Sequence, residues 1–109
     1  MTASVEAAGL VRRAEAEGGF AAILRKGDAD RGALILIIRT RGRYAACLER
    51  ALGVDGLYRW TRVGPDESTD EAKLAEFLEK RARFDEDSWL IELDIAQAER
   101  FVAETISAG

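Results

Sequence analysis

The sequence predicts one α+β domain, in which an antiparallel sheet of four to five strands packs with about three helices in the order α-β-β-β-β-α-β-α. Short apolar segments joined by glycine-containing connectors dominate residues 20–63. Helix-forming residues with three- and four-residue apolar spacing dominate residues 68–84 and 95–107. The only proline, Pro65, separates the two patterns. Because 109 residues is the size of one domain, we expect residues 1–109 to form a single unit.

The first two helices are expected to have sharp ends. Residues 4–17 are rich in Ala, Glu and Arg, which are strong helix formers, and a pair of glycines follows them. Residues 68–84 begin with Ser68 and Glu71 at the spacing of a capping box, in which each side chain binds a free backbone N–H group of the first turn. These patterns predict one helix before the strands and one after them.

Five segments are expected to form strands. Residues 33–39 are apolar on both faces, which is typical of a strand at the centre of a covered sheet. Residues 57–63 alternate between two faces, whereas residues 43–52 also leave a helix open because of their alanines. Short connectors with glycine favour hairpins, so the first four strands are expected to form an antiparallel meander. The expected strands are residues 20–26, 33–39, 43–52, 57–63 and 88–93, and Asp94 is expected to cap the last helix.

The charged loop between Gly27 and Gly32 has the glycine spacing of a phosphate-binding loop but lacks its chemistry. Ala33 and Leu34 stand where that motif needs Lys and Ser or Thr, and a strand follows instead of a helix. The calcium-loop pattern also fails, because its glutamate at the twelfth position is missing. We therefore expect a plain turn, which selects Gly and Asp for conformational reasons.

Few residues could support catalysis or bind a metal ion. The carboxylates of residues 85–87 could bind Mg²⁺, but consecutive side chains rarely converge on one ion, so a solvated loop is expected. The sequence has no histidine, which excludes a Ser-His-Asp triad and leaves Cys47 without the usual partner that activates a thiol. Glu92 and Asp94 share a strand face, a common arrangement on solvated surfaces. We expect no catalytic residue, no metal and no cofactor, and an enzyme is the less favoured interpretation.

Charge is distributed unevenly along the chain. Residues 19–64 hold nine Lys and Arg against four Asp and Glu, whereas residues 65–109 hold five against thirteen, and the whole chain has a net charge of -4. Arginines with an interleaved aromatic side chain can bind nucleic acid through phosphate contacts and stacking, although the carboxylates of this acidic chain could pair with them instead. The candidate binding residues are Arg39, Arg41, Arg43, Arg59, Trp60 and Arg62.

Because the sequence offers no recognisable set of catalytic residues, it favours a non-enzymatic interaction or regulatory module. The longest apolar run, residues 33–38, is much shorter than the ~20 residues of a membrane span, and no secretory signal is visible, so a cytoplasmic protein without membrane contact is expected. The expected partner is another protein or a second copy, because a sheet face left uncovered by helices would be buried in a homodimer. Nucleic-acid or polyanion binding through the arginines is the alternative.

Three blocks of sequence carry a resemblance to a known family. They are AEGGFAAILRKGDADRGALILI (16–37), the residues RW-R-GPD (59–66) and FLEKRARFDEDSWLIELD (77–94). Together they resemble the bacterial domain-of-unknown-function 1491 family over roughly residues 5–95. The resemblance implies a short stand-alone cytoplasmic protein, and because no activity is assigned to the family, no catalytic residue carries over from it.

Overall fold

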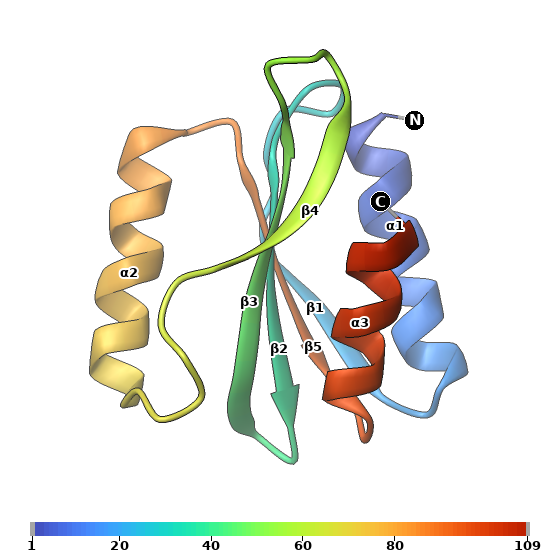
Figure 1. Ribbon diagram of the computed structural model, residues 1–109, viewed down its shortest axis with the longest axis vertical. Helices are drawn as coiled ribbons and strands as arrows, with labels where there is room; N and C mark the ends of the chain where they lie inside the picture. The colour runs from blue at the N-terminus through green and yellow to red at the C-terminus, as the bar shows by residue number, and fades with distance from the viewer. Residues whose placement is uncertain (1, 109) are drawn as a thin grey trace.

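The computed structural model describes residues 2–108, which form three helices and a five-stranded sheet (Figure 1). The order α-β-β-β-β-α-β-α and the α+β class are confirmed, and residues 43–52 form a strand. Among the described residues no helix is long and apolar enough to cross a membrane. The elements are α1 (Ala3–Ala16), β1 (Phe20–Arg25), β2 (Leu34–Thr40), β3 (Arg43–Leu52), β4 (Tyr58–Val63), α2 (Glu71–Phe84), β5 (Trp89–Asp94) and α3 (Ala98–Ala108).

The sheet is mixed rather than purely antiparallel, and its strand order is β1-β5-β2-β3-β4. The β2–β3 and β3–β4 hairpins form as predicted. The predicted meander is wrong at β1, because β5 lies between β1 and β2, antiparallel to β1 and parallel to β2. The connector 26–33 is long enough to cross the roughly 10 Å taken by an intervening strand. The two-residue turn 41–42, by contrast, forces its strands to be neighbours.

Helices cover both faces of the sheet and give the molecule three layers, with α1 and α3 on one face and α2 on the other (Figure 1). The central strand β2 is buried on both faces, as its sequence predicts. Leu34, Leu36 and Ile38 belong to the core beneath α1 and α3, whereas Ile35 and Ile37 belong to the core beneath α2. Successive side chains of one strand therefore hold two separate cores together.

The predicted capping box of the second helix is wrong. Asp70 is the N-cap of α2, and its carboxylate accepts the N–H of Lys73 at 2.8 Å. Ser68 lies outside the helix and donates its hydroxyl to Asp66 at 2.5 Å. An aspartate directly before the helix competes successfully for the cap, because its carboxylate both accepts the free N–H and favours the positive helix end.

The predicted cap of the last helix is also wrong, because Asp94 belongs to β5 and α3 begins only at Ala98. Asp94 pairs with Phe20 on one side and with Arg39 on the other, so the sheet ladder extends to this residue. Its carboxylate is bonded to the β2–β3 turn instead. Pairing with two neighbouring strands therefore overrides the local capping preference of an aspartate.

The loop between Gly27 and Gly32 is a turn that packs against the residues before β5. The Asp28 carboxylate accepts backbone N–H groups inside the loop at 2.8 and 2.9 Å, and the indole of Trp89 donates to the Asp28 carbonyl at 2.7 Å. Both glycines lie directly against the carbonyl oxygen of Asp87, where a Cβ atom would collide with it. The glycines are therefore needed for close approach between two chain segments.

Candidate functional site

Arg39 is held in an ion-pair network beneath α2. Its Nε donates to Glu92 at 2.9 Å, and its terminal nitrogens donate to Glu71 at 2.9 and 3.0 Å. The hydrogen bond with Glu71 raises the pKa of Arg39 above its ordinary value, and Arg39 lowers the pKa of Glu71. Arg39 therefore joins the first turn of α2 to the sheet, and only 15% of its side chain is exposed.

The three candidates on β4 lie in different environments. Arg59 pairs with Asp55 of the preceding turn at 2.6 Å, whereas Trp60 is buried in the core beneath α1 and α3. Arg62 is exposed and has no carboxylate within 4.0 Å among residues 2–108. Arg59 lies beside the C-terminal end of β3, about 26 Å along the strand from Arg43 at its start. The six predicted residues are therefore spread over the sheet and do not form one patch.

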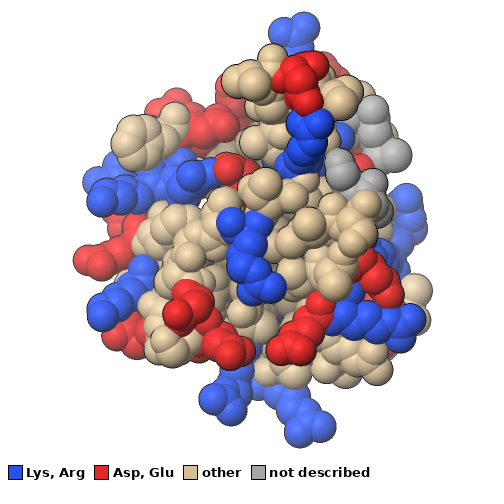
Figure 2. All heavy atoms as spheres, in the orientation of Figure 1, with Lys and Arg blue, Asp and Glu red and all other residues tan. Residues whose placement is uncertain are grey.

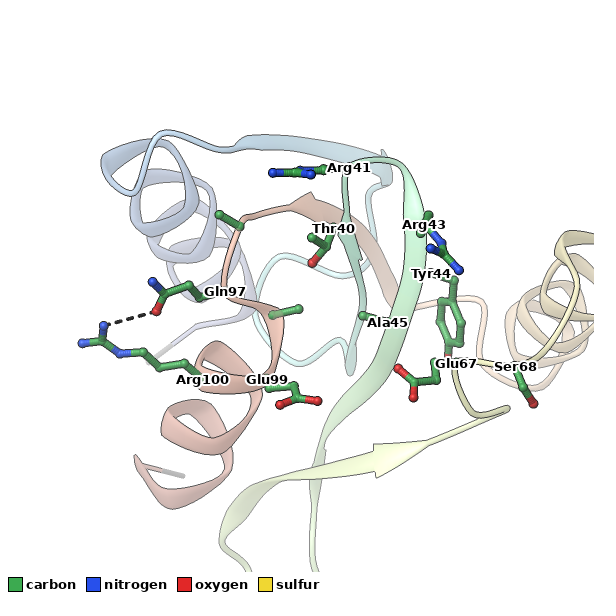
Figure 3. Close-up of a pocket in the computed structure, with 12 residues that line it drawn as sticks. Thr40, Arg41, Arg43, Tyr44, Ala45, Glu67, Ser68, Gln97, Glu99 and Arg100 are labelled. Carbon is green, nitrogen blue, oxygen red and sulfur yellow. Dashed lines mark hydrogen bonds between the residues drawn. The ribbon is translucent and has the colours of Figure 1, made fainter.

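Arg41 and Arg43 both line a groove of about 990 Å³, which we call the turn groove (Figure 3). Its floor is the start of β3. One wall is the loop between β4 and α2, and the other is the segment that leads into α3. Its lining includes Arg41, Arg43, Ala45, Glu67, Gln97 and Glu99. Three segments that are distant in sequence therefore build this groove.

The β2–β3 turn at one end of the groove is held by Asp94. Arg41 has φ 52° and Gly42 has φ 78°, so both central residues are in the left-handed region that a two-residue hairpin turn requires. The Asp94 carboxylate accepts the N–H of Arg41 at 2.9 Å and that of Gly42 at 2.7 Å. An arginine rarely adopts this conformation, and the two charge-assisted hydrogen bonds hold it there.

Both walls of the groove are also bonded to the hairpin. The hydroxyl of Thr40 donates to the carbonyl of Ile95 at 2.9 Å, before α3. The hydroxyl of Tyr44 donates to the carbonyl of Pro65 at 2.6 Å, in the opposite wall. Burial raises the pKa of Tyr44 to about 12, so this hydroxyl remains a donor at neutral pH. The groove is therefore a preformed feature of the fold.

The groove has charges of opposite sign at its two ends. In Figure 3, Arg41 and Arg43 lie towards one end, and Glu67 and Glu99 lie on opposite walls towards the other. Neither arginine has a carboxylate within 4.0 Å among the described residues. In Figure 2, basic side chains protrude at the end of the molecule where the β2–β3 turn lies, and acidic side chains follow above them. The groove therefore suits a ligand that carries both charges.

Reactive groups are not assembled at the groove. Cys47 is buried on the α2 side of the sheet, and burial raises the pKa of its thiol to about 12. The carboxylates of residues 85–87 are exposed in a loop, and Asp85 accepts the N–H of Asp87. Within residues 2–108 no group of three His, Cys, Asp or Glu side chains is placed to hold a metal ion. The side chains that line the groove offer charged and hydrogen-bonding groups to a ligand.

A second surface lies at the opposite edge of the sheet. Strand β1 has β5 on one side and, within residues 2–108, no strand on the other, and its apolar side chains remain accessible. Phe20 is 79% exposed, and Ile23 and Leu24 are also exposed. We define the β1 edge surface as Phe20, Ala22, Ile23 and Leu24. In the sequence, the uncharged run from residue 20 to residue 24 indicates an apolar segment. Only the strand order shows that this segment is an edge of the sheet.

Comparison with protein-family models matches residues 1–103 to a family described as "Protein of unknown function (DUF1491)". The chain belongs to the DUF1491 family. This confirms the resemblance carried by the three sequence blocks. No curated protein matches the chain.

Three solved structures that resemble this DUF1491 chain come from two bacteria. A crystal structure of a DUF1491 family protein from Caulobacter crescentus CB15 is 32% identical, with a TM-score of 0.73 over 86% of this chain and 87% of that one. An NMR structure of a DUF1491 family protein from the same organism is 33% identical, with a TM-score of 0.76 over 90% and 88%. The solution structure of protein Atu0922 from A. tumefaciens is 27% identical, with a TM-score of 0.72 over 86% and 85%.

Proposed function

We propose that this DUF1491 protein is a non-enzymatic interaction module that forms a homodimer through edge strand β1. The observation that carries the proposal is the β1 edge surface: an accessible strand edge with apolar, uncharged side chains from Phe20 to Leu24. Edge strands that stay unpaired are usually protected by charges, prolines or covering elements. Strand β1 has neither charge nor proline between residues 20 and 24, so it is suited to pair with another strand.

The helix on the second face of the sheet leaves β1 uncovered. Strands β2 to β5 contribute to the core beneath α2, and β1 contributes nothing to it. Phe20 and Ala22 pair with Asp94 and Glu92 and share their side of the sheet, the α2 side. This is the arrangement in which a second copy would bury apolar surface that the helices do not reach.

The charges at the two ends of β1 favour a second copy as the partner. Glu17 precedes the strand and Lys26 follows it, and both are exposed. In an antiparallel pair related by a two-fold axis, the start of each β1 meets the end of the other, which brings Lys26 of one copy near Glu17 of the second. The two ends of the strand are thus complementary in charge.

The oligomeric state tests this proposal. We expect light scattering coupled to size-exclusion chromatography to give the mass of a dimer, and Phe20→Asp combined with Ala22→Lys to give a monomer with an unchanged circular dichroism spectrum. Val54→Lys is the matched control, because Val54 is a fully exposed apolar residue in the β3–β4 turn. Glu17→Lys and Lys26→Glu should each weaken the dimer, and the double variant should restore it. A monomer at high micromolar concentration would refute the proposal.

The alternative function, polyanion binding through the arginines, has less support from the geometry. Arg39 and Arg59 are already paired with carboxylates, and Trp60 is buried where it cannot stack on a base. Arg41, Arg43 and Arg62 would have to provide the binding energy. A gel-shift titration of random single-stranded RNA at low salt tests this, and tight, salt-sensitive binding would favour it over the interaction module.

A further inference from the structure

Strand β3 has a neighbour on both sides along only part of its length. It pairs with β4 from Cys47 to Leu52. Arg43, Tyr44 and Ala46 pair with β2 alone, because β4 ends at Val63 and the chain turns away, and Ala45 is the extra residue where the β2–β3 register shifts. Among residues 2–108, the backbone of residues 43–46 makes no hydrogen bond outside the sheet ladder. Alternate residues of an antiparallel strand point their N–H and C=O groups to opposite sides, so part of this stretch presents free backbone groups away from β2.

The turn groove lies along this unpaired stretch. Arg43, Tyr44 and Ala45 line it, and the small side chain of Ala45 leaves room on the floor. The walls are fixed by the bonds of Thr40 and Tyr44 to the two flanking segments. A preformed channel beside an open strand edge is the geometry in which extended peptides bind, by adding a strand to an existing sheet.

We propose that the turn groove binds an extended peptide segment, which adds as a short strand beside residues 43–46 of β3. An acidic side chain of the peptide pairs with Arg41 and Arg43, and a basic side chain a few residues away pairs with Glu67 and Glu99. Four residues of extended chain span about 13 Å, so one short segment reaches from the arginine end to the glutamate end.

The charges of the groove distinguish a peptide from other polymers. A nucleic-acid strand carries a negative charge on every nucleotide and would meet Glu67 and Glu99 unfavourably. A wholly basic segment would be repelled by Arg41 and Arg43. A segment with one charge of each sign fits both ends, and its backbone supplies the groups that the open edge of β3 lacks.

This site is separate from the proposed dimer surface. Strand β1 forms one edge of the sheet, whereas the floor of the turn groove is the start of β3, and strands β5 and β2 lie between them. Peptide binding therefore does not depend on dimer formation, and the two proposals can fail independently.

NMR titration of the ¹⁵N-labelled full chain provides the test. The probe is a synthetic peptide pool, Asp-Xaa-Thr-Xaa-Lys with blocked ends, in which Xaa is Val, Ile, Leu or Tyr. We expect amide shift changes confined to residues 40–46, 67–68 and 96–100, with dissociation constants in the millimolar to micromolar range. Two control pools keep the same Xaa positions: one carries Asp at both charged positions, and the other carries N-methyl groups that remove the backbone donors. Both should bind at least about tenfold more weakly.

Protein variants identify the side chains responsible. Arg41→Asn combined with Arg43→Gln should weaken binding at least about tenfold, because it removes the charge-assisted bonds to the acidic side chain. Arg12→Gln is the matched control, since Arg12 is exposed on α1 and does not line the groove, and it should leave binding unchanged. All three substituted side chains are exposed, so the spectra should show the same fold.

Three outcomes would overturn the proposal. The first is no shift change with the pool, and the second is equal binding of the N-methylated pool. The third is the same pattern of shifts with pyrophosphate or single-stranded RNA at lower concentration, which would make the groove an anion site. A monomeric protein that binds the peptide pool would refute the homodimer and leave this inference intact.

Discussion

The Asp94 side chain should contribute strongly to the stability of the fold, at the end of the sheet where the β2–β3 turn lies. Its carboxylate is the acceptor for the N–H groups of Arg41 and Gly42, in a turn whose two central residues both have positive φ. In Asp94→Ala both N–H groups lose this acceptor, and Arg41 loses the contacts that hold it in a conformation that arginine disfavours. The hairpin itself is retained through the β2–β3 ladder, so the expected effect is destabilisation rather than loss of fold.

The magnitude follows from two charge-assisted hydrogen bonds in a half-exposed position. Hydrogen bonds to charged groups contribute about 1.5–3 kcal/mol each, and the exposed turn places these at or below the lower limit, so Asp94→Ala should cost about 2–3 kcal/mol. For a chain of this length, 1 kcal/mol corresponds to roughly 4 °C in melting temperature, which predicts a decrease of about 10 °C. Asp94→Asn keeps one oxygen acceptor and should lose about half as much.

Urea denaturation followed by circular dichroism measures this effect, and calorimetry checks the change in melting temperature. Asp55→Ala is the matched control, because the Asp55 carboxylate accepts one backbone N–H, that of Leu57 at 3.1 Å, and pairs with the exposed Arg59. Its cost should stay below about 1 kcal/mol. If Asp94→Ala costs no more than Asp55→Ala, the carboxylate does not hold the turn, and the groove lacks one of the contacts that would preform it.

Two further predictions concern the buried parts of the fold. Gly27→Ala should cost at least about 2 kcal/mol of unfolding free energy, since its Cβ would collide with the Asp87 carbonyl. Gly9→Ala, on open helix surface, should stabilise the fold by about 0.5–1 kcal/mol. Urea denaturation compares the two variants, and equal effects on stability would contradict the close approach of Gly27 to Asp87. The folded pKa of Cys47 is raised from 9.0 to about 12, so the neutral thiol is favoured in the fold, and stability should be complete below about pH 9 and should decrease as the pH rises towards 12. As the pH is raised, the melting temperature of Cys47→Val should decrease less than that of the wild type. The Cys47 thiol of the folded wild type should react with Ellman's reagent only at the rate of unfolding. Rapid reaction of this thiol in the folded protein at pH 8 would contradict its burial.

The elements of this fold were predictable because their signals are local. The two-sided apolar pattern of residues 33–38 predicts a central strand, and the glycine-containing turns at 41–42 and 53–56 predict hairpins; the structure confirms both. The position of β1 was not predictable, because strand order depends on whether α2 returns the chain to the edge of the sheet or between two strands already present. The sequence 26–33 allows either outcome.

The candidate site was less predictable for a related reason. Of the six predicted binding residues, the structure places Arg41 and Arg43 at the groove, while Arg39 is paired beneath α2. Glu67 and Glu99 were missed, because they come from segments that approach β3 only in the folded chain. An arginine cluster in sequence does not specify a cluster in space when alternate strand residues point to opposite faces.

The two free edges of the sheet differ in a way that supports a division of roles. Strand β4 carries Arg59, Thr61 and Arg62 as exposed side chains, and such charges discourage pairing with another strand. Strand β1 carries an exposed phenylalanine and no charge before Arg25. If both edge strands only had to avoid unwanted pairing with other strands, charged side chains would be expected on both. The contrast supports the proposal that β1 pairs with a second copy, while the β4 side leaves open only the short stretch beside residues 43–46, where we propose that a peptide binds.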